Sequence, residues 1–368
     1  MSENRTTSPD SLPDPQRGER DGEAAEPRRR GSRKSAGGIT LRDVAQLAGV
    51  APITASRALN TPSAVSPKVL QKVREAVEKT GYVPNLLAGG LASNKSRLVA
   101  VVVPTVIGPV FQEIVHTLTE TLAAAGYQVM LGQTGYENSR EDALLEAIIG
   151  RRPDGVVLTG IMRSAEARKR LLASGIPVVE TWDLTPTPID MLVGFSHEQI
   201  GREVARYLHG IGRRQVAVVG GRDERSQRRM NAFAQQAQAL GMHAGDAPIP
   251  MHHVVAPTTL GQGRNGLADL LQRQPDIDAV FCSSDLLALG VMIEAQSRGI
   301  SIPGQLAVVG FGDLEFSRDL QPKLTTVRID GTGIGQRAAR FIIDRAAGIE
   351  VAERIVDVGF TIIQRESA

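Results

Sequence analysis

The sequence predicts a small all-α domain near its N-terminus, followed by an α/β core of two doubly wound subdomains. Short helical segments fill residues 39–84, and from residue 98 onward apolar runs alternate with amphipathic helical stretches. Repeated strand–helix units favour parallel sheets with helices on both faces, and a run of this length suits two such subdomains with a cleft between them. The 368 residues, 42% of them hydrophobic, leave room for two or three domains.

Residues 1–38 are predicted to be a disordered polar tail. They are rich in Pro, Ser, Gly, Arg and Glu and carry almost no large apolar side chains, so burial could not offset the entropy of ordering them. The basic clusters at residues 28–30 and 33–34 could contact phosphates, or could simply be solvated.

Residues 40–60 are predicted to form two short helices around a glycine turn. Thr40 and Asp43 have the spacing of a capping box, and Gly49 supplies the left-handed backbone that ends the first helix. Pro52 suits the first turn of the second helix, because its missing N–H would have no partner there. The apolar face of the first helix is formed by Leu41, Val44, Ala45 and Ala48. Together these features predict a helix-turn-helix, whose second helix can enter a DNA major groove.

A third helix is predicted to begin at Ser66-Pro67 and to end at Gly81. Three helices followed by an extended stretch would complete a compact headpiece, residues 39–84. The first two helices alone could also be an ordinary helical pair within a larger core, and the third helix favours the headpiece.

The most specific stretches of the headpiece are Thr40-Leu41-x-Asp43-Val44-Ala45, Ala48-Gly49-Val50, Ser56-Arg57 and Gly81-Tyr82-Val83-Pro84-Asn85. They resemble the DNA-binding domain of LacI-family transcriptional regulators, and the resemblance extends over nearly all of the chain after residue 38. It implies that residues 85–97 form a hinge helix or linker that orders on DNA, where Leu91 would wedge into the minor groove. The candidate DNA-binding residues are Thr40, Pro52, Ile53, Thr54, Ser56, Arg57, Asn60, Asn85 and Leu91.

Positive charge is concentrated in the headpiece, as is expected of a protein that binds nucleic acid. The chain carries +2 overall, but residues 39–97 carry +5 and residues 98–368 carry −4. A single cysteine, Cys282, excludes an internal disulfide framework. Neither a membrane-spanning apolar run nor a signal-peptide core is present in the sequence, so a cytoplasmic protein without membrane contact is expected.

The resemblance implies a periplasmic-binding-protein-like core over residues 98–368. Crossings between subdomains are expected near residue 195, near 327–330 and near 347–349. The expected N-subdomain then covers about 98–195 and 327–347, and the C-subdomain about 196–326 and 348–368. Strands are predicted near residues 99–103, 127–131, 156–159, 178–182, 216–219, 280–283, 306–311 and 359–364.

No catalytic, cofactor or metal site is predicted. The glycines at 331, 333 and 335 have the wrong spacing for a dinucleotide fingerprint. His252 and His253 are adjacent on a predicted strand, so their side chains point to opposite faces and are not expected to share a metal. An α/β sugar-binding protein or enzyme stays as an alternative, although the former needs export and the latter a cofactor loop or acid–base pair.

The resemblance implies that a small-molecule effector binds in the cleft between the two subdomains. Arg229, in the pattern Arg229-x-Asn231-x-Phe233, falls where the family uses an arginine, and a guanidinium can hold a carboxylate through two hydrogen bonds. Asp285 could instead cap a helix. The candidate effector-binding residues are Phe111, Thr159, Glu180, Arg229, Ser284, Asp285 and Asp313.

Further stretches resemble the gluconate-operon repressors of the family. They are Val110-Phe111-x-Glu113, Gly126-Tyr127-Gln128-x-Met130-Leu131, Pro177-Val178-Val179-Glu180, Val193-Gly194-Phe195, Phe281-Cys282 and Gly359-Phe360-Thr361. This resemblance implies a sugar-acid effector, gluconate or a phosphorylated relative, with a different sugar as the alternative. Two half-sites of a near-palindromic operator would require two headpieces, so a homodimer is expected.

Overall fold

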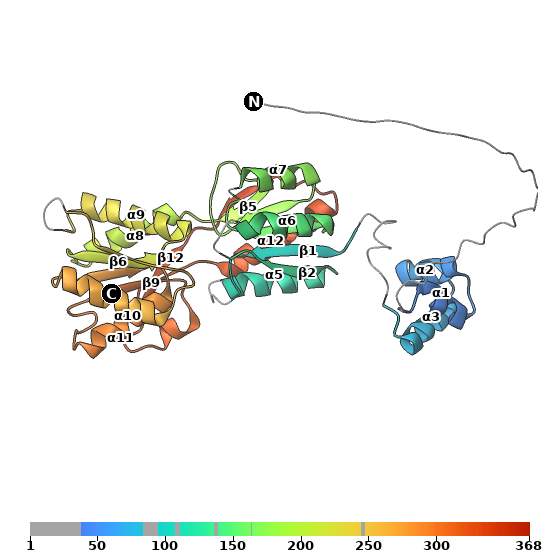
Figure 1. Cartoon of the computed structure of the whole chain (residues 1–368), viewed down its shortest axis with the longest axis horizontal. Helices are drawn as coiled ribbons and strands as arrows, with labels where there is room; N and C mark the ends of the chain where they lie inside the picture. The colour runs from blue at the N-terminus through green and yellow to red at the C-terminus, as the bar shows by residue number, and fades with distance from the viewer. Residues whose placement is uncertain (1–37, 84–94, 107–110, 136–138, 163, 244–246) are drawn as a thin grey trace, which may run out of the picture. The chain divides into compact units, whose positions relative to one another are not determined.

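The computed structural model describes residues 38–83, 95–106, 111–135, 139–162, 164–243 and 247–368. The chain divides into two compact units, Met1–Asn85 and Leu86–Ala368 (Figure 1). The expected tail up to residue 37, and Asn85 and Leu91 of the expected hinge, lie outside the described residues. No helix among the described residues is long and apolar enough to span a bilayer.

The headpiece consists of three helices around a small apolar core. They are α1 (Leu41–Ala48), α2 (Pro52–Asn60) and α3 (Pro67–Thr80), with a 3₁₀ turn, η1 (Pro62–Ala64), between the last two. The predicted ends are confirmed: Asp43 accepts two hydrogen bonds from Thr40 at 2.7 Å, and Gly49 and Gly81 both adopt a φ of 64°. The core is built from small side chains, so the three backbones approach closely. Its buried members are Val44, Ala45, Ala48, Ala55, Ala58, Val73 and Ala76.

The core unit contains two six-stranded sheets, which confirms the predicted pair of doubly wound subdomains. The N-subdomain sheet has the order β11-β5-β4-β3-β1-β2, and the C-subdomain sheet the order β12-β10-β9-β8-β6-β7. All pairings are parallel except that of β12 with β10. The strands are β1 (Leu98–Val103), β2 (Gln128–Gln133), β3 (Gly155–Thr159), β4 (Val178–Thr181), β5 (Met191–Gly194), β6 (Val216–Gly221), β7 (Met251–Val254), β8 (Ala279–Cys282), β9 (Ala307–Phe311), β10 (Thr325–Arg328), β11 (Ile355–Asp357) and β12 (Thr361–Ile363).

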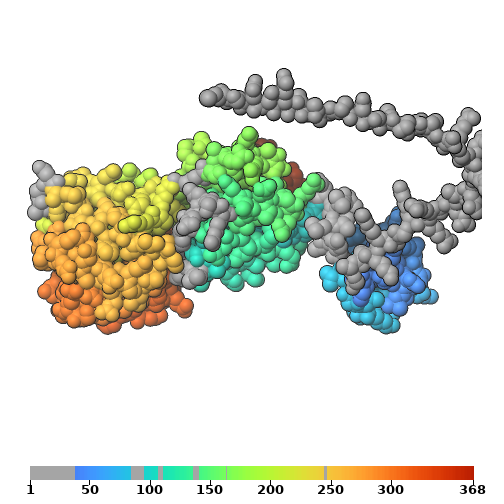
Figure 2. All heavy atoms as spheres, in the orientation of Figure 1, coloured from blue at the N-terminus to red at the C-terminus, as the bar shows by residue number. Residues whose placement is uncertain are grey.

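Helices cover both faces of each sheet (Figure 1). In the N-subdomain, α5 (Gln112–Ala124) and α12 (Gly331–Ala346) cover one face, and α6 (Ser139–Gly150) and α7 (Ala165–Ser174) the other. In the C-subdomain, α8 (His197–Gly210) and α9 (Glu224–Ala239) lie opposite α10 (Leu260–Arg273) and α11 (Asp285–Ser297). One apolar cluster includes α5, α12, α8 and α9, so it is continuous through both subdomains. Figure 2 shows yellow and green atoms meeting at the boundary between them.

The chain crosses between subdomains at three places: β5 to α8, β10 to α12, and β11 to β12. The third crossing differs from the expectation near residues 347–349, because β11 pairs in parallel with β5 and keeps the chain in the N-subdomain up to Asp357. The second crossing lies close to the expected residues 327–330, because Val327 and Arg328 pair within the C-subdomain and the N-subdomain resumes at α12. Strands of three or four residues carry too little periodicity to be placed from sequence alone.

Gly201 allows the backbones of α8 and α9 to touch. A Cβ at this position would lie 2.2 Å from the carbonyl oxygen of Arg229 and 2.7 Å from the amide nitrogen of Phe233. Both obstacles are backbone atoms, so they cannot rotate away. The close contact of these helices therefore fixes the backbone position of Arg229.

Gly201→Ala is expected to lower the free energy of unfolding of the core by about 1–3 kcal/mol, because overpacking would force α8 and α9 apart. Urea titration followed by circular dichroism measures this loss. Gly261→Ala is the matched control: a Cβ there meets nothing within 4 Å, so no loss is expected, and the higher helix propensity of alanine should raise the free energy of unfolding by up to about 1 kcal/mol. Equal effects of the two substitutions would contradict the packing argument.

Candidate functional site

The solvent-facing side of α2 carries the residues expected to contact DNA. Ile53 is 63% exposed, and Pro52 and Arg57 are also exposed, whereas Ala55 and Ala58 are buried in the headpiece core. Thr54 and Ser56 are half-buried, and Asn60 donates a hydrogen bond to the Ser56 hydroxyl at 3.2 Å. Exposing a large apolar side chain such as Ile53 to water is unfavourable for the isolated domain. Together with Arg57, however, this side chain matches the chemistry of the major groove, where it can contact a thymine methyl group while the arginine contacts a base edge.

Arg229 lies at the C-terminal ends of the C-subdomain strands, where parallel sheets place their ligands. The residue is only 4% exposed, and its guanidinium carbon lies 3.9 Å from the centre of the Phe311 ring. One guanidinium nitrogen donates to the Ser283 carbonyl at 3.0 Å, and its Nε has no acceptor among the described residues. Burial lowers the pKa of Arg229 to about 10, and Asp223 partly offsets that shift. Arg229 therefore stays charged at neutral pH, with one donor unsatisfied.

His197, the first residue of α8, accepts a hydrogen bond from the other terminal nitrogen of the Arg229 guanidinium. Nδ1 of His197 lies 2.9 Å from Nη1 of Arg229, and Nε2 lies 3.0 Å from the carbonyl oxygen of Trp182. Because arginine only donates and a carbonyl only accepts, the proton must reside on Nε2. Burial, followed by the charge of Arg229, holds the pKa of His197 well below its ordinary value. The imidazole is therefore neutral and connects the two subdomains.

Two further arginines of α9 contact the N-subdomain. The guanidinium of Arg225 lies over the Phe111 ring, 5.4 Å from its centre, and donates to the carbonyl of Thr159 at 3.4 Å. Arg228 forms an ion pair with Asp183, whose side chain is 3% exposed. Phe111 in turn packs edge-on against Trp182, 5.4 Å between ring centres. Three of the expected effector residues, Phe111, Thr159 and Arg229, are thus brought together where the subdomains meet.

Glu180 does not join this group. It is fully buried in β4, and its two oxygens accept the main-chain N–H groups of Met162 and Ile189, each at 2.8 Å. Burial raises the pKa of Glu180, and the two hydrogen bonds act in the opposite direction. The expectation that Glu180 binds effector hydroxyls is therefore not supported by its geometry, because its side chain is used to fix loops of the N-subdomain.

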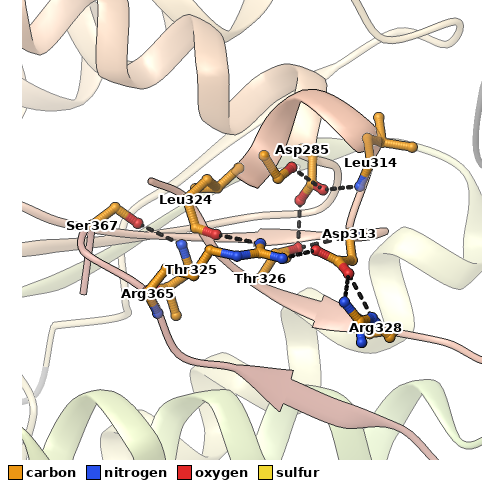
Figure 3. Close-up of polar contacts among 10 residues, drawn as sticks. Asp285, Asp313, Leu314, Leu324, Thr325, Thr326, Arg328, Arg365 and Ser367 are labelled. Carbon is orange, nitrogen blue, oxygen red and sulfur yellow. Dashed lines mark hydrogen bonds and ion pairs between the residues drawn. The ribbon is translucent and has the colours of Figure 1, made fainter. Parts of the chain in front are cut away.

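Asp285 and Asp313 are also engaged within the C-subdomain (Figure 3). Asp285 is fully buried and accepts hydrogen bonds from Leu314 N at 2.8 Å, from the Ser317 hydroxyl at 2.8 Å and from the Thr326 hydroxyl at 2.5 Å. Burial raises its pKa despite these bonds. The helix cap expected at Asp285 falls one residue earlier, on Ser284, whose hydroxyl accepts the amide of Leu287.

Asp313 pairs with two arginines from separate segments. Arg365 lies 2.6 Å away near the C-terminal end, and Arg328, at the end of β10, holds the second oxygen (Figure 3). The Asp313 side chain is nearly buried by these partners. Both carboxylates therefore tie loops to β10, which explains why they are buried, and neither is left to receive a ligand.

Sequence reasoning missed Asp183, Arg225, Arg228 and His197. Arg225 could have been found, because it lies four residues before Arg229 and therefore on the same face of a helix. Asp183 gave no such signal: it follows β4 in a loop, and only folding brings it to α9.

The neutral state of His197 predicts an acid-sensitive core. Because its folded pKa lies below its unfolded value of about 6.5, the unfolded chain binds the extra proton first, and the free energy of unfolding falls as pH decreases through that value. In His197→Gln, which cannot take up this proton, the melting temperature should fall less between about pH 8 and about pH 5.5. The exposed His116→Gln is the control and should keep the wild-type slope. Identical slopes for all three proteins would contradict the assignment.

Comparison with known proteins places both units in one family. Residues 40–85 match the family described as "Bacterial regulatory proteins, lacI family", and residues 205–368 match a periplasmic binding protein-like domain. The chain is 37% identical to the HTH-type transcriptional regulator GntR of Pseudomonas aeruginosa over 335 residues, covering 91% of this chain and 97% of the relative.

Solved structures agree with this placement. A LacI-family transcriptional regulator from Silicibacter pomeroyi superimposes with a TM-score of 0.83 at 33% identity, covering 90% of this chain and 99% of that one. The lac repressor dimer bound to operator and the anti-inducer ONPF has a TM-score of 0.77 at 22% identity, covering 89% and 98%, and at that identity it shows the fold alone. With its helix-turn-helix headpiece and two-sheet core, the chain belongs to the LacI family of bacterial transcriptional regulators, which are DNA-binding proteins and not enzymes.

Proposed function

We propose that this regulator represses genes of sugar-acid catabolism and that gluconate, or a related sugar acid or its phosphate, controls its binding to DNA. The single observation that carries the proposal is the buried Arg229, whose Nε has no acceptor among the described residues. With Arg225 and Arg228 on the same helix, it makes this side of the cleft cationic. A carboxylate or phosphate is the ligand chemistry that such a site favours.

In this proposal α2 reads the operator. Arg57 reaches a guanine edge, Pro52 and Ile53 make apolar contacts to thymine methyl groups, and Thr40, Thr54, Ser56 and Asn60 contact phosphates. A homodimer presents two headpieces to two half-sites of the operator. The lac repressor structure is likewise named as a dimer bound to operator. Asn85 and Leu91 would belong to the hinge segment that orders on DNA and enters the minor groove.

The two binding events are linked through the core. An effector that favours one relative orientation of the subdomains changes DNA affinity, and DNA must then change effector affinity by the same factor. Phe111 and Thr159 contribute the N-subdomain side of this site, and Arg229 contributes the C-subdomain side. Ser284, at the start of α11 and within 3.3 Å of the Thr258 hydroxyl, is a further candidate for a ligand hydroxyl.

Titration of the full chain by calorimetry tests the effector chemistry. The panel is D-gluconate, 6-phosphogluconate and their uncharged counterparts D-glucose and sorbitol, each with and without operator DNA selected from a random pool. Heat from the acids alone, together with a change in operator affinity, supports the proposal. Equal binding of glucose, or no response to any acid, refutes the sugar-acid effector while leaving the DNA-binding role intact.

Arg57→Ala is expected to lower the discrimination between selected operator and random DNA by about 1–3 kcal/mol, because a bidentate contact with guanine would be lost. Fluorescence anisotropy with both DNAs at one salt concentration gives this difference. Lys72→Ala removes an exposed positive charge of α3 that carries no base-reading role in this proposal, so any weakening should be the same for both DNAs. If Arg57→Ala also weakened both equally, Arg57 would be a phosphate-positioning residue.

Arg229→Lys is expected to keep the charge but lose the planar fork, and so to weaken gluconate binding by about tenfold or more, about 1.4 kcal/mol. Operator affinity without effector should stay close to wild type, which shows that the headpiece still functions. The control Arg273→Lys alters an arginine of α10 that pairs with Asp269, and should bind gluconate normally. A normal gluconate response in Arg229→Lys would place the acid elsewhere.

A further inference from the structure

Asp183 and Arg228 form an ion pair between the two subdomains at the proposed effector site. Asp183 follows β4 in the N-subdomain, and Arg228 lies in α9 of the C-subdomain. The Asp183 side chain is 3% exposed, whereas that of Arg228 is 24% exposed. A buried carboxylate without its partner is strongly unfavourable, so this pair favours the arrangement in which the subdomains touch.

The ion pair with Asp183 leaves hydrogen-bond donors of Arg228 unused. One Asp183 oxygen accepts the main-chain N–H of Leu184 at 2.8 Å, so only the other oxygen meets Arg228, through a single terminal nitrogen. The Nε of Arg228 is buried and has no acceptor among the described residues. A free carboxylate or phosphate can engage two donors of a guanidinium at once, which Asp183 does not do. An anionic ligand is therefore a better partner for Arg228 than Asp183 is.

The backbone holds Asp183 in place for this contact. Trp182, the residue before it, adopts a φ of 68°, a left-handed conformation that is unfavourable for a tryptophan. Gly194 in β5 makes room for the loop, because a Cβ there would lie 1.8 Å from the carbonyl oxygen of Asp183. The carboxylate is thus presented by a packed and strained segment, in contrast to a freely rotating surface side chain.

The balance of charge favours an incoming anion. Without ligand, the charge of Arg228 is met by Asp183, and the nearby His197 is neutral. When Asp183 is displaced from Arg228, one positive charge loses its partner. A ligand that carries its own negative charge supplies the replacement, whereas a neutral sugar leaves Arg228 uncompensated.

We propose that Asp183 is an internal competitor that occupies Arg228 until an anionic effector displaces it, and that this exchange selects for anions and opens the subdomain contact. The inference rests on the proposed sugar-acid effector. Because only the fraction of molecules with Arg228 released binds the ligand, Asp183 lowers the apparent affinity by that fraction. Asp183 is therefore a specificity-determining residue that acts against binding, in contrast to a carboxylate that accepts ligand hydroxyls.

The test compares D-gluconate affinity in wild type, Asp183→Asn, Arg228→Gln and the double variant, by calorimetry on the full chain. Asp183→Asn removes the competing charge with little change of shape, so gluconate should bind about tenfold tighter. Arg228→Gln should bind gluconate more weakly, and adding Asp183→Asn to it should bring no gain. Tighter binding of D-glucose by Asp183→Asn, relative to wild type, is expected as well, since the penalty against neutral ligands is reduced.

Asp190→Asn is the matched control. Asp190 is also a partly buried acid of the N-subdomain, but it pairs with Arg345 and Arg354 and not with α9. Its substitution should leave gluconate affinity unchanged. Weaker gluconate binding by Asp183→Asn would overturn the proposal and make Asp183 a ligand-binding group, and unchanged binding would overturn it too.

A measurement without ligand separates this inference from the proposed effector. Trp182, the only tryptophan of the chain, is 5% exposed and adjacent to Asp183. Quenching of its fluorescence by acrylamide should be faster in Asp183→Asn and in Arg228→Gln than in wild type or Asp190→Asn. Unchanged quenching refutes the ion-pair contact. Faster quenching in proteins that bind no sugar acid supports the contact and refutes the proposed effector.

Discussion

The burial of one guanidinium, that of Arg229, is the constraint around which the C-subdomain side of the contact between the subdomains is arranged. A charge removed from water must be met by dipoles and by opposite charge. The Ser283 carbonyl, the neutral ring of His197 and the face of Phe311 provide those contacts. Burial alone would raise the pKa of Asp223, yet Arg229, the hydrogen bond to Ser226 and Arg225 together lower it. Even the close contact of α8 with α9 serves this placement, because Gly201 lies against the Arg229 backbone.

The acidic residues of the C-subdomain are used in a different way. Asp285 holds the loop after β9 and the side chain of Thr326 in β10, while Asp313 holds Arg328 and Arg365. These contacts fix the strand that leads back into the N-subdomain. Because these carboxylates are engaged within the C-subdomain, they do not pair with the arginines of α9. In the proposed function, the preference for an anionic ligand would arise as much from the placement of these acids as from the placement of the arginines.

The two subdomains are joined by three kinds of contact that act together. One apolar cluster continues through both, the chain crosses between them at three places in its described part, and the α9 arginines reach Phe111, Thr159 and Asp183. A ligand that changes only the last of these contacts can alter the relative stability of two orientations without unfolding either subdomain. Such a system responds only to the difference in affinity for its two states, so the inter-subdomain contacts determine how strongly it responds.

The sequence by itself determined the elements and the family. Capping residues, glycine ends and periodicity act within a few residues of one another, so the ends of α1 and α3, the strands near residues 99–103 and 306–311, and the exposed face of α2 could all be predicted. Arg229 could be selected as a candidate effector residue because its motif lies within one helix. Only the tertiary structure decided which acids remained available. Glu180, Asp285 and Asp313 are engaged by main-chain, hydroxyl and arginine partners, most of them far away in sequence. The strand β11 joins the N-subdomain sheet through pairing with β5. Likewise, Asp183 met Arg228 only through folding, because no local pattern encodes a contact between a loop of one subdomain and a helix of the other.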